Sequence, residues 1–138
     1  MLAQTEWKHD DVFEGRAENG NTITFDADAA HIHGPSPMEA VLMALCGCTS
    51  VDVVGILKKK RQPLTSLRVS AVATQAETAP RVFTAIKLIY AISGRLSRKA
   101  VEDAVSLSKH KYCSVSLMLE KAAAVDYEIV YLDGEPEP

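Results

Sequence analysis

The sequence lacks several features by which common classes of protein are recognised. No glycine-rich phosphate loop is present, because Gly47 and Gly55 fall inside a stretch that is expected to be helical. A nucleotide site therefore has no support. The formal charge is −3, and the single basic run, residues 58–61, is as short as the charged end of a helix. We expect no nucleic-acid partner.

Cysteine is also scarce, with three residues in a chain of 138. Few cysteines in an ordinary globular composition are typical of a reducing compartment, where they are buried, bound to metal or reactive. The first residues, MLAQTEWKHDD, contain no apolar run of the kind that a signal peptide needs, so we expect a cytoplasmic protein. The length and the absence of repeats or linkers predict one domain, residues 1–138, with a polar tail from about residue 133.

What the chain does contain is one long apolar stretch, residues 36–61. Ser36 is suited to be an N-cap, with proline at the first helical position and Glu39 three residues later, which together make a capping box. Lysines at the other end are stabilised by the negative pole of a helix dipole, and Pro63 prevents the helix from continuing. We therefore predict a helix over Pro37–Lys60.

This helix is apolar on nearly all sides. Between Ala40 and Leu57, only Thr49, Ser50 and Asp52 are clearly polar. Such a helix must be buried on nearly all sides, either in a membrane or in protein. A central aspartate is costly in lipid, so we favour a helix that is enclosed by sheet or packed against its copy in a dimer, and we expect no membrane association. Asp52 then needs a partner, for which the expected residues are Arg16, Arg68 and Arg81.

The remaining elements are read from alternation and turn residues. Strands are expected at residues 5–8, 12–16, 22–26, 64–77, 82–92 and 123–132, with a hairpin turn at Asn19-Gly20-Asn21. Helices are expected at residues 97–110 and 114–121, the second capped by Ser114. Because strands and helices are segregated along the chain, the pattern predicts an α+β fold.

The cysteines are the first candidates for chemistry. Cys46 and Cys48 are two residues apart, so on a helix they point about 200° away from each other and cannot easily form a disulfide. Cys113 precedes the short second helix, where a thiolate would be stabilised by the dipole. The alternative is that these thiols are small buried hydrophobic groups without chemistry.

A metal site and an acid–base pair are weaker alternatives. The available ligand types are His31, His33, His110 and the three cysteines, but their spacing matches no zinc finger or ribbon. We therefore expect no metal and no other bound cofactor. Glu39 is explained by the capping box, and Asp52 by a structural ion pair.

Taken together, the run Gly34-Pro-Ser-Pro-Met-Glu, Cys48 within a long apolar helix, a following β-hairpin and the run Lys111-Tyr-Cys-Ser-Val-Ser resemble the OsmC/Ohr family (osmotically induced protein and organic hydroperoxide resistance protein). The similarity is closest to a small bacterial branch with the run PMExVLMAxxGCxxxDVVxILKK, and it covers roughly residues 10–132.

The resemblance implies an intertwined homodimer in which two long helices are enclosed by wrapped antiparallel sheets, with active sites at the subunit interface. It implies a stress-response thiol peroxidase acting on small hydrophobic organic hydroperoxides, with Cys48 as the peroxidatic and Cys113 as the resolving cysteine. An external dithiol is the expected reductant. The family stabilises the thiolate with an arginine that is held by a glutamate; the matching residues here are Arg16 and Glu39.

One position departs from the family pattern. The family glutamate directly follows the proline of its motif, whereas this chain has Met38 there and Glu39 next. A shift of one residue turns a side chain by about 100° around a helix. Three functions therefore stay open: a peroxidase, a redox-sensing or ligand-binding dimer with little turnover, and a structural protein with inert thiols. We expect the first.

Overall fold

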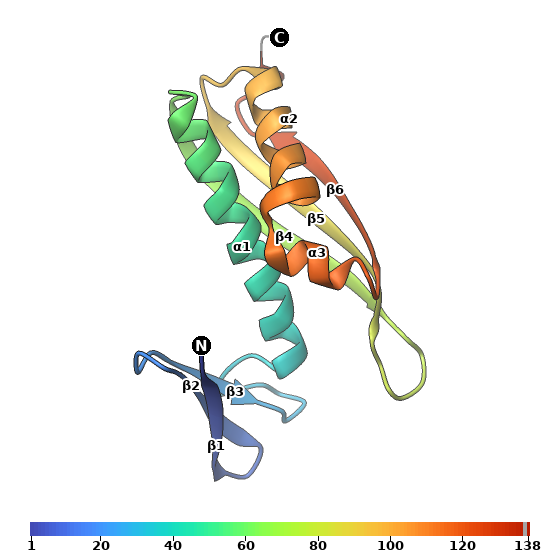
Figure 1. Cartoon of the computed structure of the whole chain (residues 1–138). Coiled ribbons are helices and arrows are strands. Elements are labelled where there is room, and N and C mark those ends of the chain that lie inside the picture. Colours follow the sequence, from blue (N-terminus) through green and yellow to red (C-terminus); the bar gives the residue numbers. More distant parts are fainter. Residues whose placement is uncertain (137) are drawn as a thin grey trace. The chain divides into compact units, whose positions relative to one another are not determined.

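The computed structural model describes residues 1–136 and 138, and the chain forms two compact units, Met1–Leu42 and Met43–Pro138. The first unit contains an antiparallel meander of β1 (Ala3–His9), β2 (Val12–Ala17) and β3 (Thr22–Asp26), in the order β1-β2-β3 (Figure 1). Gly20 at the turn between β2 and β3 has a φ of 91°, which glycine adopts without strain. The hairpin predicted from Asn-Gly is confirmed.

The long helix α1 (Pro37–Lys59) begins in the first unit and continues into the second. The predicted capping box is present: the Glu39 amide donates to Ser36 Oγ at 3.1 Å, and the Ser36 amide donates to Glu39 Oε1 at 3.0 Å. By length and composition alone, α1 could cross a membrane, and 22% of that stretch is buried within the chain.

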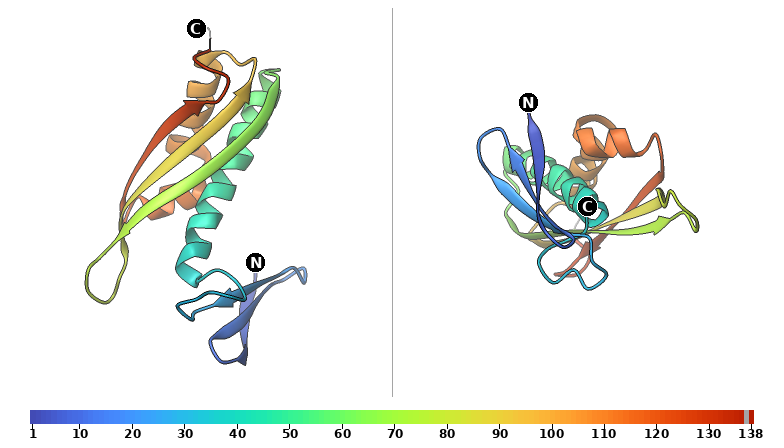
Figure 2. Two further views of the ribbon diagram at one scale, coloured as in Figure 1. Left: turned by 180° about the vertical axis from the view of Figure 1, so that it is seen from behind. Right: turned by 90° about the horizontal axis from the view of Figure 1, so that it is seen from below.

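The second unit packs helices against one face of a three-stranded sheet with the order β4-β5-β6 (Figures 1 and 2). Its further elements are β4 (Leu64–Gln75), β5 (Phe83–Gly94), α2 (Arg98–Leu107), the π-helical turn η1 (Ser108–Tyr112), α3 (Ser114–Leu119) and β6 (Ala124–Tyr131). β4 and β5 form an antiparallel hairpin, whereas β5 and β6 are parallel, so the expectation of antiparallel sheets was wrong for this pair. The segment α2-η1-α3 is the crossover that a parallel pair requires.

The core of this unit follows from two periodicities. On β5, alternate residues Ile86, Leu88, Tyr90 and Ile92 are buried, which puts one face of the strand inward. On α1, every fourth residue is buried: Leu45, Thr49, Val53 and Leu57. Val101, Ala104 and Val105 complete the core from α2. The predicted α+β class with a central helix is confirmed.

Two local predictions were wrong. The helix expected over residues 97–110 ends at Leu107 and continues as the π-helical turn η1. The short helix α3 is capped by Cys113 rather than Ser114, because Cys113 has extended backbone angles and its sulfur accepts the Ser116 amide at 3.4 Å. Ser114 is instead the first residue of the helix.

Candidate active site

Two of the predicted redox residues lie together in the second unit. Cys48 is on α1 and partly buried, whereas Cys113 lies between η1 and α3 and is fully buried. Both are free thiols, and they are close enough that Cys48 raises the pKa of the Cys113 thiol. The fold therefore brings into direct interaction two cysteines that are far apart in the sequence.

The environment of Cys113 favours its protonated form. Burial, above all, raises the pKa of its thiol to about 11, although the amide of Ser116 acts in the opposite direction. The neighbouring Cys48 side chain and the negative charge of Asp52 raise it further. At neutral pH Cys113 is a thiol, and its S–H can donate to the sulfur of Cys48.

The π-helical turn η1 sets the position of Cys113. The Cys113 amide donates to the Ser108 carbonyl at 2.8 Å, a bond that spans five residues and widens the last turn after α2. Turns of this kind are frequent at functional sites. Because Ser108 begins the turn and Cys113 follows it, fixing Ser108 also fixes the backbone at Cys113.

A line of buried hydroxyl groups runs beside the two cysteines. Thr49 Oγ1 lies 2.6 Å from the hydroxyl of Tyr90 and 2.7 Å from Ser108 Oγ, and Ser108 Oγ lies 2.9 Å from Asp52 Oδ2. We call Tyr90, Thr49 and Ser108 the hydroxyl chain. All three residues are at most 1% exposed.

The carboxylate at the end gives this chain a direction. An ionised Asp52 can only accept, so Ser108 must donate to it. Ser108 then accepts from Thr49, and Thr49 accepts from Tyr90. Burial raises the pKa of Tyr90 to about 12, which keeps the first donor of the chain protonated.

The partner of Asp52 differs from the expected one. We predicted an ion pair with Arg16, Arg68 or Arg81, but among the described residues of the second unit no salt bridge joins Asp52 to Arg68, Arg81 or another cation, and Ser108 is its hydrogen-bond donor. Asp52 is only partly buried, so its charge keeps some solvation and one hydroxyl donor suffices.

Cys46 occupies a different side of α1. It is partly buried, and burial raises the pKa of its thiol. Its carbonyl accepts a hydrogen bond from Ser50 Oγ at 2.7 Å. The separation from Cys48 that was expected from helical geometry follows from their two-residue spacing on a continuous helix.

The two predicted activating residues belong to the first unit and have partners there. Arg16 Nη2 lies 2.8 Å from Glu14 Oε1, and Arg16 Nη1 donates to the Gly20 carbonyl at 3.4 Å. Glu39 is held by Ser36, whose amide and hydroxyl lower the pKa of its carboxyl group. Among the described residues no ion pair joins Arg16 to Glu39. Their role in activating Cys48 stays a prediction.

The histidines His31 and His33 serve the loop before α1. His31 Nδ1 lies 2.8 Å from the Asp26 carbonyl, and the His33 amide donates to Asp26 Oδ2 at 3.1 Å. Amides of Asp28 and His33 lower the pKa of the buried Asp26 carboxyl group. In the described part of the chain, no three histidine, cysteine, aspartate or glutamate residues are grouped to hold a metal ion.

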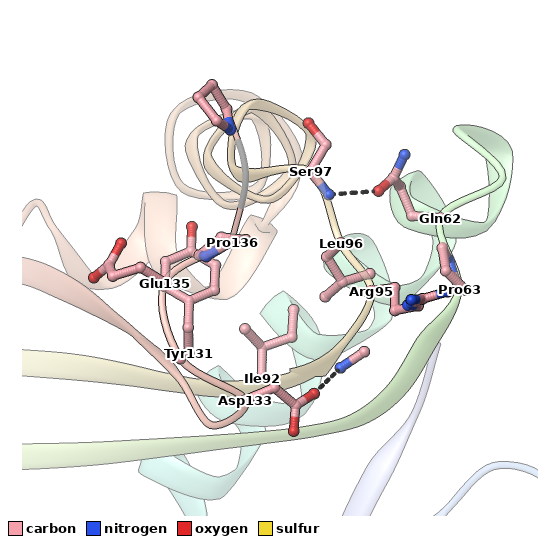
Figure 3. Close-up of a pocket in the computed structure, with 13 residues that line it drawn as sticks. Gln62, Pro63, Ile92, Arg95, Leu96, Ser97, Tyr131, Asp133, Glu135 and Pro136 are labelled. Atoms are coloured by element: carbon pink, nitrogen blue, oxygen red, sulfur yellow. Dashed lines mark hydrogen bonds between the residues drawn. The ribbon is translucent and has the colours of Figure 1, made fainter.

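A separate cavity of about 710 Å³ lies beyond the N-terminal end of α2 (Figure 3). Gln62 Oε1 accepts the amide of Ser97 there, and Asp133 accepts the amide of Gly94. Its walls include Arg95 but none of the three cysteines. It is therefore distinct from the cysteine pair.

Sequence reasoning found the cysteines but missed most of the hydroxyl chain. Thr49 and Asp52 carried a signal, because they are polar positions in an apolar run. Ser108 and Tyr90 carried none, since a serine near a helix end and a tyrosine in a strand are ordinary. Their role depends on the packing of α2 and β5 against α1.

The fold and the site together define an α+β protein with an apolar central helix and a pair of interacting free cysteines, one partly and one fully buried. Within this class, the family model described as OsmC-like protein matches residues 27–128. The chain is also 44% identical over 133 residues to protein YhfA of Escherichia coli K12, covering 94% of this chain and 98% of that protein. The chain belongs to the OsmC-like family.

Solved structures agree with this assignment. A hypothetical protein from Aquifex aeolicus VF5 has a TM-score of 0.81 at 30% identity, covering 94% of this chain and 96% of its own. An organic hydroperoxide resistance protein OsmC from Legionella pneumophila has a TM-score of 0.70 at 13% identity, covering 94% and 95%. The second similarity is one of fold. The family resemblance inferred from the sequence is confirmed.

Proposed function

We propose that the protein is a thiol peroxidase that reduces small hydrophobic organic hydroperoxides. The observation that carries this proposal is the pair of interacting free thiols, Cys48 and Cys113, in a member of the OsmC-like family. The thiolate of Cys48 attacks the peroxide, the O–O bond breaks, and the alkoxide leaves with a proton as an alcohol. Cys48 is thereby oxidised to a sulfenic acid.

Cys113 completes the cycle in this proposal. Its sulfur attacks that of the Cys48 sulfenic acid, an S–S bond forms, the S–O bond breaks, and the hydroxide leaves with the thiol proton as water. An external dithiol then reduces the disulfide by exchange, so no bound cofactor is needed. Such a reductant suits a cytoplasmic setting.

Access to Cys48 supports a hydrophobic substrate. On α1, Ala44, Gly47 and Val51 are exposed, and helical spacing places them around Cys48 at positions −4, −1 and +3. Cys48 therefore lies at the border between the buried face of α1 and an exposed apolar face. An alkyl hydroperoxide approaching from this face would meet apolar groups first.

The same exposed face supports a homodimer. Val51 is 74% exposed and Met43 is 56% exposed, although both lie on the most apolar helix of the chain. We propose that a second copy covers this face, so that the active sites lie at the interface. A Val51→Glu variant should shift the protein towards monomers in light scattering at fixed concentration; Thr84→Glu, an exposed change on β5, should not.

The direct test of the chemistry is the intact mass of the reduced protein after one equivalent of cumene hydroperoxide, followed by peptide mapping. We expect a rapid loss of two hydrogen atoms that maps to a Cys48–Cys113 disulfide. Cys48→Ser should abolish peroxide consumption, and Cys113→Ser should leave an oxidisable Cys48 without cycling. Cys46→Ser is the matched control and should behave as the wild type; a dead Cys46→Ser variant would refute the assignment of the nucleophile.

A second function is favoured by one observation. Met38 stands where the family has its glutamate. Glu39 is the next residue, and it is hydrogen-bonded to Ser36 in the helix cap. Weak activation of Cys48 would leave a redox-sensing or ligand-binding dimer that is oxidised stoichiometrically with little turnover. Turnover with excess hydroperoxide and dithiothreitol separates the two functions. Arg16→Ala should then slow the oxidation of Cys48 only if the arginine acts as the family resemblance implies.

A further inference from the structure

The resolving step of the proposed cycle needs Cys113 to stay within bonding distance of Cys48. The two residues are on different elements, and in the described part of the chain one side-chain bridge joins those elements beside the thiols. Ser108 forms it: the Ser108 carbonyl holds the Cys113 amide, and the Ser108 hydroxyl contacts Thr49 and Asp52 of α1. One residue thus connects the backbone at Cys113 to the turn of α1 that follows Cys48.

Asp52 is the strongest partner in this bridge. Hydrogen bonds to an ionised acceptor are roughly twice as strong as neutral ones. Asp52 also accepts the Ser108 hydroxyl and thereby adds a second side-chain bond between η1 and α1. Without it, Ser108 keeps only its bond to Thr49, and the η1 turn is held to α1 less firmly.

We propose that Asp52 is a positioning residue for disulfide formation: through the Ser108 hydroxyl it holds the η1 turn so that Cys113 faces Cys48. This inference rests on the proposed redox pairing of the two cysteines. The reaction it serves is the condensation already balanced above, in which Cys113 displaces hydroxide from the Cys48 sulfenic acid. Asp52 touches neither sulfur in this role, and it need not exchange a proton.

Other charged and titratable groups near the site do not replace it. Cys48 is the other charged group that acts on Cys113, and Lys109 of η1 is directed to Glu120, with 3.9 Å between Nζ and Oε2. The negative charge of Asp52 also opposes loss of the Cys113 proton. Before Cys48 is oxidised, this keeps Cys113 protonated and thus a poor second target for peroxide.

The test follows the two steps separately. Reduced protein is mixed with one equivalent of cumene hydroperoxide, and quenched samples are divided between dimedone labelling of sulfenic acid and intact mass. In Asp52→Ala and Ser108→Ala, we expect Cys48 to be oxidised within about threefold of the wild-type rate, whereas disulfide formation should slow by roughly tenfold or more, as expected for lost positioning. Dimedone-labelled Cys48 should accumulate in both variants.

The Asp52→Asn variant distinguishes a positioning role of Asp52 from a general contribution to the stability of the fold. Its amide oxygen still accepts from Ser108, so disulfide formation should recover to within about threefold of the wild type, and partial rescue by an isosteric acceptor is not expected of a general loss of packing. Asp126→Ala, which removes an exposed aspartate of β6, is the matched control. Thermal unfolding of each variant checks that it is folded at the assay temperature.

Diamide distinguishes failure of this inference from failure of the peroxidase proposal, because it forms the same disulfide without a peroxide. If hydroperoxide leaves wild-type Cys48 unchanged while diamide closes the disulfide more slowly in Asp52→Ala, the peroxidase proposal fails and the positioning role stands. If Asp52→Ala and Ser108→Ala close the disulfide at the wild-type rate with both oxidants, the positioning role is overturned. An Asp52→Asn variant as slow as Asp52→Ala would also overturn it.

Discussion

The hydroxyl chain predicts that Tyr90→Phe destabilises the wild-type protein but stabilises a Thr49→Val variant. Thr49→Val removes the central hydroxyl with almost no change in shape. The Tyr90 hydroxyl, in a fully buried residue, then loses its acceptor, and Ser108 loses its incoming donor. An unsatisfied buried hydroxyl costs about 1–3 kcal/mol and a lost hydrogen bond about 1 kcal/mol, so we expect a loss of roughly 2–4 kcal/mol in the free energy of unfolding.

Tyr90→Phe is the second substitution, which together with Thr49→Val makes a double-mutant cycle. In the wild type it removes one hydrogen bond to Thr49 and keeps the ring beside Tyr127, so it should cost about 1 kcal/mol. In the Thr49→Val background the same change removes an unsatisfied hydroxyl. It should therefore stabilise the protein there by about 1–3 kcal/mol, which makes the double variant more stable than Thr49→Val alone.

Chemical denaturation of the four proteins measures this cycle, at one protein concentration so that association does not differ between samples. The sign reversal is the decisive readout, since errors in the absolute free energies cancel in the comparison. If Tyr90→Phe destabilises both backgrounds by the same amount, the two hydroxyls are not coupled. The Tyr90–Thr49 hydrogen bond would then contribute nothing to stability.

Three further predictions concern stability. Gly94→Ala should destabilise by roughly 2–4 kcal/mol in urea unfolding, because φ is 130° and a Cβ would lie 2.4 Å from the Pro63 carbonyl oxygen; Gly55→Ala, whose Cβ would meet no neighbour within the described residues, should not destabilise. Gly15→Ala should cost about 1–2 kcal/mol by the same measurement, since its Cβ would lie 2.8 Å from the Phe25 ring, which must move. Stability should fall from about pH 8.5 towards pH 11, because the folded state holds the Cys113 proton more tightly than the unfolded chain; Cys113→Ser should flatten this part of the pH curve, and an unchanged slope would contradict the burial of that thiol.

Local chemistry explains which parts of the fold could be predicted. The start of α1 was predictable because the capping box Ser36–Glu39 is formed by residues three apart, and both of its hydrogen bonds are present. The turn at Gly20 was predictable for the same reason. The η1 turn was not, because α2 and η1 share one helical sequence pattern and differ only in which carbonyl the Cys113 amide reaches.

In the candidate site, the two cysteines were predicted from the sequence, but the hydrogen bonds of the groups around them were not. The roles of Cys48 and Cys113 came from their resemblance to a family, and the fold then brought the two side chains together. The partner of Asp52 was mispredicted because charge alone suggested an arginine. A partly exposed carboxylate is satisfied by the hydroxyl of Ser108, whose approach depends on the packing of α2 against α1 and leaves no trace in the local sequence.

The composition of α1 can now be explained by the two faces of the helix and the border between them. One face, with Leu45, Val53 and Leu57, packs into the core of the second unit, and an exposed face around Val51 is left for the second copy in the proposed dimer. Cys48 and Asp52 lie on the narrow border between these faces, one turn apart. A helix that is apolar nearly all round is therefore suited to a protein dimer, because the one charged residue between Ala40 and Leu57 sits where Ser108 satisfies it and where a thiol can still be reached.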